Sequence, residues 1–187
     1  DFFVLHTNQH QDPLLRETIF SQMGYAPDFI FPQPYSVGAA IDWVCDLIHS
    51  LQIDLILVNG DTAASIIGAI AAVYSDVGLV HVEAGLRAFD NCMYEERNRI
   101  MVDSAAHYLF TYTQHHAEYL NKIPDLRGRI FNVGNTTIDL IQDFSAELVK
   151  LRSDRYAYIT LHRKEFTDSR AKMIDVFSTL NTLADEF

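Results

Sequence analysis

Short apolar runs alternate with longer amphipathic segments along most of the chain. The apolar runs predict buried parallel strands at Phe2–His6, Leu55–Asn59, Leu79–Glu83, Tyr108–Tyr112, Ile130–Val133 and Tyr156–Leu161. The amphipathic segments predict helices at Leu14–Met23, Val37–Leu51, Ala63–Ser75, Glu95–His107, His115–Asn121, Thr137–Leu151 and Arg170–Glu186. Segment Asp28–Tyr35 contains Pro32 and Pro34 among apolar residues, which predicts a loop or an edge strand. The alternation is typical of an α/β fold with a parallel sheet.

The composition of the 187 residues narrows the class of partner. Fourteen Lys and Arg against 25 Asp and Glu give a net charge of −11, so nucleic acid is not an expected partner. A small phosphorylated ligand remains possible, because a few placed arginines suffice locally. No apolar run is long enough to span a membrane. Two distant cysteines predict neither a disulfide framework nor a zinc site, and a cytoplasmic location is expected.

Polar residues follow the carboxyl ends of several predicted strands, the edge at which open α/β sheets bind ligands. After Leu55–Asn59 come Gly60, Asp61 and Thr62. Gly60 permits a tight turn, and the free N–H groups of the next helix face an anion. The alternative is that Asp61 or Thr62 only caps that helix.

The next strand ends on Glu83, and Arg87 follows four residues later. A carboxylate that is partly desolvated between strand ends has a raised pKa and can serve as an acid or a base. Arg87 can neutralise a phosphate or that carboxylate. The alternative is a structural ion pair between Glu83 and Arg87 that ties two loops together.

Two helix starts add further candidates. Glu95 begins a predicted helix with Arg99 one turn later, which is also the spacing of an ordinary intrahelical ion pair. Asn135 follows Gly134 between a strand and a helix, where it can either cradle a phosphate or cap the helix.

The last predicted strand is followed by His162, Arg163 and Glu165. His162 can transfer a proton near neutral pH, and Arg163 can hold a diphosphate. The chain lacks GxGxxG, GxxxxGK[ST], HExxH and paired CxxC motifs, which disfavours a dinucleotide dehydrogenase and a Walker-type NTPase. We therefore expect neither a metal nor a cofactor.

Taken together, these segments resemble the non-hydrolysing UDP-N-acetylglucosamine 2-epimerases in order and spacing. The matching segments are Val58–Thr62, His81–Arg87 (HVEAGLR), Glu95–Arg99, Gly134–Asp139, Thr160–Glu165 and, for the family's TxQH loop, Thr7–His10. The resemblance implies a glycosyltransferase-B-like fold of two Rossmann-like domains, with a nucleotide-sugar in the cleft between them. This chain would supply the N-terminal part, a doubly wound parallel sheet.

The resemblance also implies an activity and a set of roles. The activity is the interconversion of UDP-GlcNAc and UDP-ManNAc by anti elimination of UDP to 2-acetamidoglucal, followed by re-addition. The implied acid and base candidates are Asp61, Glu83 and Glu95, with His162 assisting at the diphosphate. The implied substrate-binding residues are Arg87, Arg99, Asn135, Arg163 and Glu165, and the implied regulatory nucleotide-sugar site contains Gln9 and His10. The complete protein would be a homodimer.

Several departures from the family indicate a partial chain. The family begins with an apolar strand followed by GTRPE, which this sequence does not contain. The charged stretch Lys150–Arg155 predicts a boundary between an N-terminal domain, 1–152, and the first strand and helix of a second domain, 153–187. We therefore expect the 187-residue chain to be inactive by itself. Two alternatives stay open: a hydrolysing 2-epimerase that releases ManNAc and UDP, and a catalytically silent nucleotide-sugar-binding fragment.

Overall fold

The computed structural model describes residues 2–9, 20–21, 24–32, 34–147, 156–161 and 167–184. The chain divides into two compact units, Asp1–Ile141 and Gln142–Phe187. The boundary predicted after residue 152 falls among residues 148–155, outside the described part, and it stays a prediction.

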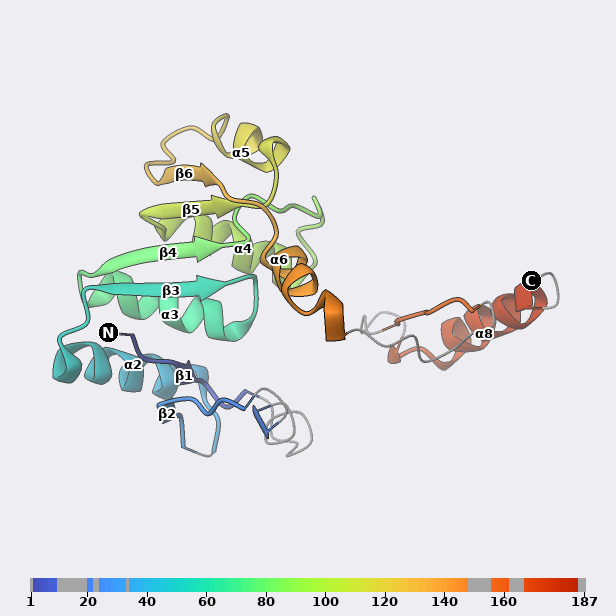
Figure 1. Ribbon diagram of the computed structural model, residues 1–187, viewed down its shortest axis with the longest axis horizontal. Coiled ribbons are helices and arrows are strands. Elements are labelled where there is room, and N and C mark those ends of the chain that lie inside the picture. Colours follow the sequence, from blue (N-terminus) through green and yellow to red (C-terminus); the bar gives the residue numbers. More distant parts are fainter. Residues whose placement is uncertain are drawn as a thin grey trace. The chain divides into compact units, whose positions relative to one another are not determined.

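All paired strands of the first unit are parallel (Figure 1). Four of them form one sheet in chain order: β3 (Leu55–Asn59), β4 (Gly78–Val82), β5 (Tyr108–Thr111) and β6 (Arg129–Asn132). A separate pair consists of β1 (Leu5–His6) and β2 (Phe29–Ile30), so the proline-containing segment does form a short strand. The predicted α/β class with a parallel sheet is confirmed.

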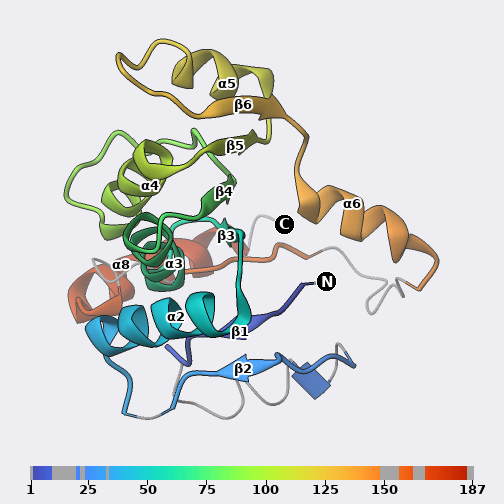
Figure 2. The same cartoon turned by 90° about the vertical axis from the view of Figure 1, so that its left-hand side faces the viewer.

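From β2 to β6 a helix lies between each strand and the next, the kind of crossover that parallel pairing needs. They are α2 (Val37–Leu51), α3 (Ala63–Tyr74), α4 (Tyr94–Ala105) and α5 (Gln114–Leu120), and β6 is followed by α6 (Thr136–Asp143). Figure 2 shows α3 and α4 side by side on one face of the four-stranded sheet. Helix α2 has the bounds that its apolar periodicity predicts. No described helix is long and apolar enough to cross a membrane.

Two apolar clusters hold the first unit together. One lies between the sheet and its helices and is centred on fully buried Leu79, Val102, Leu109 and Leu120. The other joins α2 to α3 through Ala40, Val44, Ile48, Ile67 and Ala71, with Phe31 after β2. Strand β4 is buried along nearly its whole length, which explains why its sequence is apolar on both faces. These clusters fix the carboxyl ends of β3 and β4 next to the start of α4.

The second unit differs from its prediction. Residues Tyr156–Leu161 form no strand: a strand needs a partner for its backbone hydrogen bonds, and the described residues of this unit contain none. Helix α8 (Arg170–Ala184) is present as predicted. The helix predicted over Thr137–Leu151 is shorter, because α6 ends at Asp143 and a 3₁₀ helix, η2 (Ser145–Glu147), follows it.

Candidate active site

Two neighbouring turns bring Asp61 and Glu83 to the same edge of the sheet. Asn59 pairs with Val82, so the turns that follow β3 and β4 leave adjacent strands at matching positions. The backbone N–H of Gly60 donates to the carbonyl of Val82 at 3.0 Å, which joins the two turns directly. The expectation that the strand-end carboxylates gather at one edge is met for these two residues.

The Glu83 side chain lies over the backbone of Gly60. Glu83 has a φ of +76°, in the left-handed region that is unfavourable for any residue with a Cβ. A methyl group at Gly60 would lie 2.7 Å from Oε2 of Glu83, and Gly60 itself has a φ of +69°. Glycine at position 60 is therefore required both by the turn and by the approach of the carboxylate.

The environment of Glu83 suits proton transfer. Burial raises the pKa of the Glu83 carboxyl above its ordinary value, and the nearby Asp61 carboxylate raises it further. The positive charges of Arg99 and His81 act in the opposite direction. A carboxyl group whose pKa is moved towards neutrality is suited to both accept and donate a proton near neutral pH.

Asp61 is held by α4. Its carboxylate is ion-paired with Arg99, and its backbone carbonyl accepts a hydrogen bond from the side chain of Asn98 at 2.7 Å. Arg99 also contacts the carboxylate of Glu96 at 3.7 Å. The N-cap residue of α3 is Thr62, whose side chain makes no capping hydrogen bond. Asp61 is thus committed to Arg99 rather than to the cap.

The paired glutamates at the start of α4 have different environments. Glu96 is 2% exposed and accepts hydrogen bonds from the backbone N–H groups of Ala88 at 2.8 Å and Phe89 at 3.3 Å. It therefore holds the loop between β4 and α4. Glu95, in the first turn of the same helix, is only partly buried. Of the two, Glu95 is the one accessible for chemistry.

A buried carboxylate that the sequence analysis did not single out lies beneath these turns. Asp103, on α4, is 1% exposed and accepts hydrogen bonds from three directions. They come from Nδ1 of His81 at 2.6 Å, from a guanidinium nitrogen of Arg87 at 2.7 Å and from the backbone N–H of Gly85 at 3.2 Å. A histidine within an otherwise apolar strand is the sequence signal that could have identified the cluster, because buried polar groups require partners.

Arg87 is directed towards this cluster, and its ion pair is with Asp103, not with Glu83. Its guanidinium lies over the ring of Tyr119, 5.1 Å from the ring centroid. Together with His115 and His116, Arg87 lines a cavity of about 60 Å³. Its Nε atom is buried and has no hydrogen-bond partner within the described part of the chain.

Other predicted site residues lie elsewhere. The Asn135 side chain accepts a hydrogen bond from the backbone N–H of Thr137 at 2.9 Å, the capping role that the sequence left open. Gln9 follows β1 and is partly buried. His10, His162, Arg163 and Glu165 lie outside the described residues. The catalytic, substrate-binding and regulatory roles of all six remain predictions.

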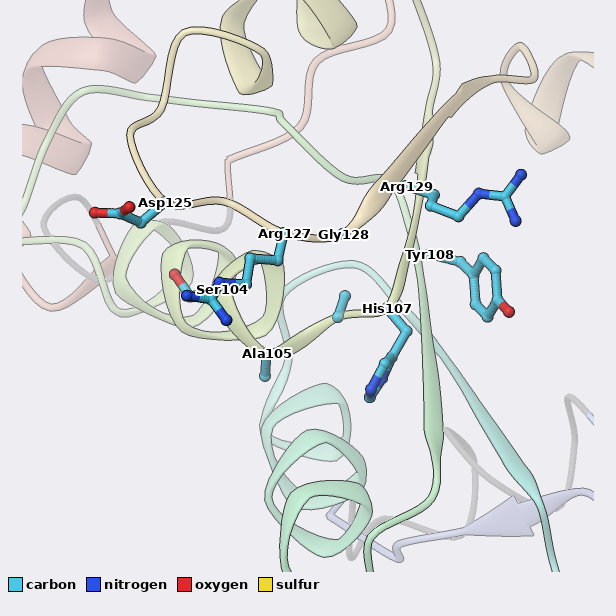
Figure 3. Close-up of a pocket in the computed structure, with 9 residues that line it drawn as sticks. Ser104, Ala105, His107, Tyr108, Asp125, Arg127, Gly128 and Arg129 are labelled. Atoms are coloured by element: carbon cyan, nitrogen blue, oxygen red, sulfur yellow. The ribbon is translucent and has the colours of Figure 1, made fainter.

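Another cavity among the described residues is at the opposite end of the strands. It has a volume of about 360 Å³ and lies where α4 ends and β5 and β6 begin (Figure 3). Its lining residues include His107, Asp125 and Arg127. Since open α/β sheets bind ligands at the carboxyl ends of their strands, this cavity is not the candidate active site. The described residues contain no group of three or more His, Cys, Asp or Glu that could hold a metal ion.

The structure defines an α/β protein that carries a cluster of carboxylates, the candidate site, at the carboxyl ends of a parallel sheet. The profile of the family described as UDP-N-acetylglucosamine 2-epimerase matches residues 1–187. The chain belongs to the UDP-N-acetylglucosamine 2-epimerase family.

Individual relatives agree with this assignment. The chain is 28% identical to a UDP-N-acetylglucosamine 2-epimerase of Methanococcus maripaludis, over 100% of this chain and 56% of the relative. It is 31% identical to a UDP-2,3-diacetamido-2,3-dideoxy-D-glucuronate 2-epimerase of Pseudomonas aeruginosa, over 96% of this chain and 54% of that protein. The chain therefore spans about half the length of these curated relatives.

A solved structure extends the match to three dimensions. The crystal structure of the Methanocaldococcus jannaschii UDP-GlcNAc 2-epimerase, in complex with UDP-GlcNAc and UDP, superposes with a TM-score of 0.82 at 27% identity. The match covers 99% of this chain and 55% of that one, so the fold is that of the N-terminal half of a glycosyltransferase-B-like 2-epimerase.

Proposed function

We propose that the full-length protein interconverts UDP-GlcNAc and UDP-ManNAc without net hydrolysis. The observation that carries the proposal is the joint placement of Asp61, Glu83 and Arg99 at one sheet edge, in a chain that belongs to the 2-epimerase family. The relative with the matching crystal structure binds UDP-GlcNAc and UDP.

The reaction requires groups of the kind found at this edge. One carboxylate removes the proton from carbon 2 while the bond from carbon 1 to the diphosphate oxygen breaks, which gives 2-acetamidoglucal and UDP. In re-addition the diphosphate oxygen attacks carbon 1, and a second group returns a proton to the opposite face of carbon 2. Inversion at carbon 2 therefore needs two acid and base groups, and Asp61, Glu83 and Glu95 are the proposed candidates.

Arg99 is the proposed partner of the departing diphosphate. Its terminal nitrogens are held by Asp61 and Glu96, while its Nε is buried without a hydrogen-bond partner in the described part of the chain. Developing negative charge on the diphosphate is stabilised best by cations that are already oriented. His162 and Arg163 are proposed to assist there on the strength of the family resemblance.

Proton NMR of the full-length protein with UDP-GlcNAc in D₂O tests the proposal. The expected result is UDP-ManNAc together with deuterium at carbon 2 of the intact UDP-sugars. Free ManNAc and UDP as the accumulating products would instead identify the hydrolysing type of enzyme. Binding of UDP-GlcNAc without exchange or turnover would identify a silent binding protein.

One relative suggests a second candidate substrate for the assay. The Pseudomonas aeruginosa protein, 31% identical over 96% of this chain, acts on a UDP-2,3-diacetamido-2,3-dideoxy-D-glucuronate. The same NMR assay with that sugar nucleotide compares kcat/KM for the two substrates. If kcat/KM is higher for the diacetamido uronate, that sugar nucleotide and not UDP-GlcNAc is the substrate. The proposed 2-epimerase chemistry would be unchanged.

A further inference from the structure

The side chain of His81 contacts both the turn that carries Asp61 and the carboxylate of Asp103, which binds the turn that carries Glu83. It is fully buried at the fourth of the five residues of β4. One ring nitrogen, Nδ1, lies 2.6 Å from the Asp103 carboxylate, and the other, Nε2, lies 3.0 Å from the carbonyl oxygen of Gly60. Gly60 is the residue directly before Asp61, and its backbone lies under the carboxylate of Glu83.

Both ring nitrogens of His81 face hydrogen-bond acceptors. The Gly60 carbonyl can only accept, and the Asp103 carboxylate is already the acceptor for Arg87 and for the Gly85 N–H. Both contacts are hydrogen bonds only when Nδ1 and Nε2 each carry a hydrogen, which is the imidazolium form. The arrangement is therefore a buried cation, His81, and a buried anion, Asp103, whose second oxygen is paired with Arg87.

Asp103 also anchors the other end of the Glu83 turn. Its second carboxylate oxygen accepts from the Gly85 N–H and from Arg87, while the Ala84 N–H donates to the Phe110 carbonyl at 3.0 Å. The backbone on the C-terminal side of Glu83 is thus fixed to α4 and β5. His81 fixes the facing turn, so the two carboxylates are attached to one buried network.

We propose that His81 and Asp103 are positioning residues of the epimerase: Asp103 orients His81, and His81 holds the Gly60 turn so that Asp61 and Glu83 keep their catalytic separation. The inference rests on the proposed function. Neither residue touches substrate, since both are at most 1% exposed. Their effect on the reaction passes through the turns that carry Asp61 and Glu83.

His81 has a second effect, on the charge of Glu83. The titratable groups that act on Glu83 are Asp61 from the β3–α3 turn, Arg99 from α4 and His81 from β4. Burial and Asp61 raise the pKa of Glu83, and the two cations lower it. Loss of the His81 cation therefore moves the Glu83 titration to higher pH, a change that a purely structural residue does not produce.

Three variants of the full-length protein separate these effects. His81→Gln carries its amide nitrogen at the distance of Nε2 and keeps a donor for Gly60 without the positive charge. His81→Asn carries its amide at the distance of Nδ1 and reaches only Asp103. Asp103→Asn removes the anion that orients His81. His107→Asn is the matched control, because His107 accepts from the Leu79 N–H at 3.2 Å at the opposite end of β4.

The steady-state assay of UDP-GlcNAc epimerisation gives the readouts. We expect kcat to fall about tenfold to a hundredfold in His81→Asn and Asp103→Asn, with KM within about twofold, because small displacements of catalytic groups have effects of this size. His81→Gln retains more activity than His81→Asn. In both His81 variants, the limb of the pH profile that Glu83 controls moves to higher pH, and His107→Asn leaves kcat and the profile unchanged.

Either of two kinetic results would overturn the inference. One is an unchanged pH profile in the His81 variants, which would make His81 a structural residue only. The other is an equal loss of kcat in the His107→Asn control.

A spectroscopic measurement on the unmodified protein keeps the test valid if the variants fail to fold. In full-length protein labelled with ¹⁵N-histidine, His81 should show two ring N–H groups. A single ring N–H would overturn the inference while leaving the epimerase proposal intact. Two ring N–H groups in a protein that turns over neither sugar nucleotide would sink the epimerase proposal, and with it the positioning role, although the buried geometry would stand.

Discussion

Arg99 on α4 is ion-paired with Asp61 in the turn after β3, so the guanidinium is held against one of the proposed acid and base groups before any substrate arrives. The pair is largely shielded from water, at 14% and 18% side-chain exposure, so the cost of desolvating both ions offsets much of their attraction and the pair adds little net stability. The main effect of the ion pair is to orient the Arg99 guanidinium. An arginine at this position offers planar donors that a lysine cannot replace.

We therefore expect Arg99→Lys to lower kcat/KM for UDP-GlcNAc by about tenfold to a hundredfold, with little change in the melting temperature. The measurement pairs the NMR turnover assay with a thermal melt. Kinetics equal to those of the unmodified protein would exclude a substrate-binding role for Arg99.

The adjacent glutamates of α4 should respond in opposite ways to the same substitution. Glu96→Gln weakens the hydrogen bonds to Ala88 and Phe89 at a site that is 2% exposed, and we expect a loss of about 1–3 kcal/mol in the free energy of unfolding. Glu95→Gln should leave the stability within about 1 kcal/mol and instead remove deuterium incorporation at carbon 2. Urea unfolding measures the stability of both variants, and the deuterium exchange assay measures their activity. A loss of activity only in Glu96→Gln together with a loss of stability only in Glu95→Gln would contradict the prediction.

Gly60→Ala tests the contact between the Gly60 backbone and Glu83. The added methyl group would lie 2.7 Å from Oε2 of Glu83, so the carboxylate must move, and we expect kcat to fall by at least about tenfold. Gly24→Ala is the matched control, because Gly24 has a similar φ of +62° but no atom of the described residues within 4 Å of the new methyl group. Both variants lose about 1–2 kcal/mol from the left-handed backbone, and only Gly60→Ala should lose activity.

The raised pKa of Glu83 predicts a pH-dependent effect on stability. Because burial favours the neutral form in the folded protein, the folded state binds this proton more tightly than the unfolded chain does. The contribution of Glu83 is therefore most favourable below its unfolded pKa and is lost as the pH rises through the folded pKa. We expect Glu83→Gln to be more stable than the unmodified protein at pH 7 to 8, and we expect the difference to vanish near pH 4.

Chemical denaturation of both proteins across that pH range measures the difference. If the difference in the free energy of unfolding between the two proteins stays constant with pH, the charge on Glu83 does not affect stability. The same substitution is expected to remove epimerase activity, so this gain in stability accompanies a loss of function.

Local patterns in the sequence predict much of this fold, because they report on local burial. The apolar periodicity of α2 predicts both of its ends, and the apolar run of β3 predicts Leu55–Asn59. The strand at Tyr156–Leu161 was predicted wrongly, since an apolar run cannot reveal whether a partner strand is present. Strand formation depends on that partner as much as on the run itself.

The candidate site also has one part that the sequence predicts and one part that it does not. The gathering of Asp61 and Glu83 follows from strand order, which the βαβ pattern predicts. The partners of the arginines depend on the rotational setting of α4 against the sheet, which no single segment encodes. Arg87 pairs with Asp103, 16 residues away, and not with Glu83. His81 within the apolar run of β4 signals that a buried polar partner exists, but only the packing shows that this partner is Asp103.

The left-handed backbone of Glu83 has a consequence for how such sequences are interpreted and designed. Glycine would relieve about 1–2 kcal/mol of backbone strain at this position and would also avoid burying a carboxylate. A sequence chosen for stability alone would therefore carry glycine at position 83. Glutamate at this position costs stability, which is what we expect of a residue that is retained for the proposed proton chemistry.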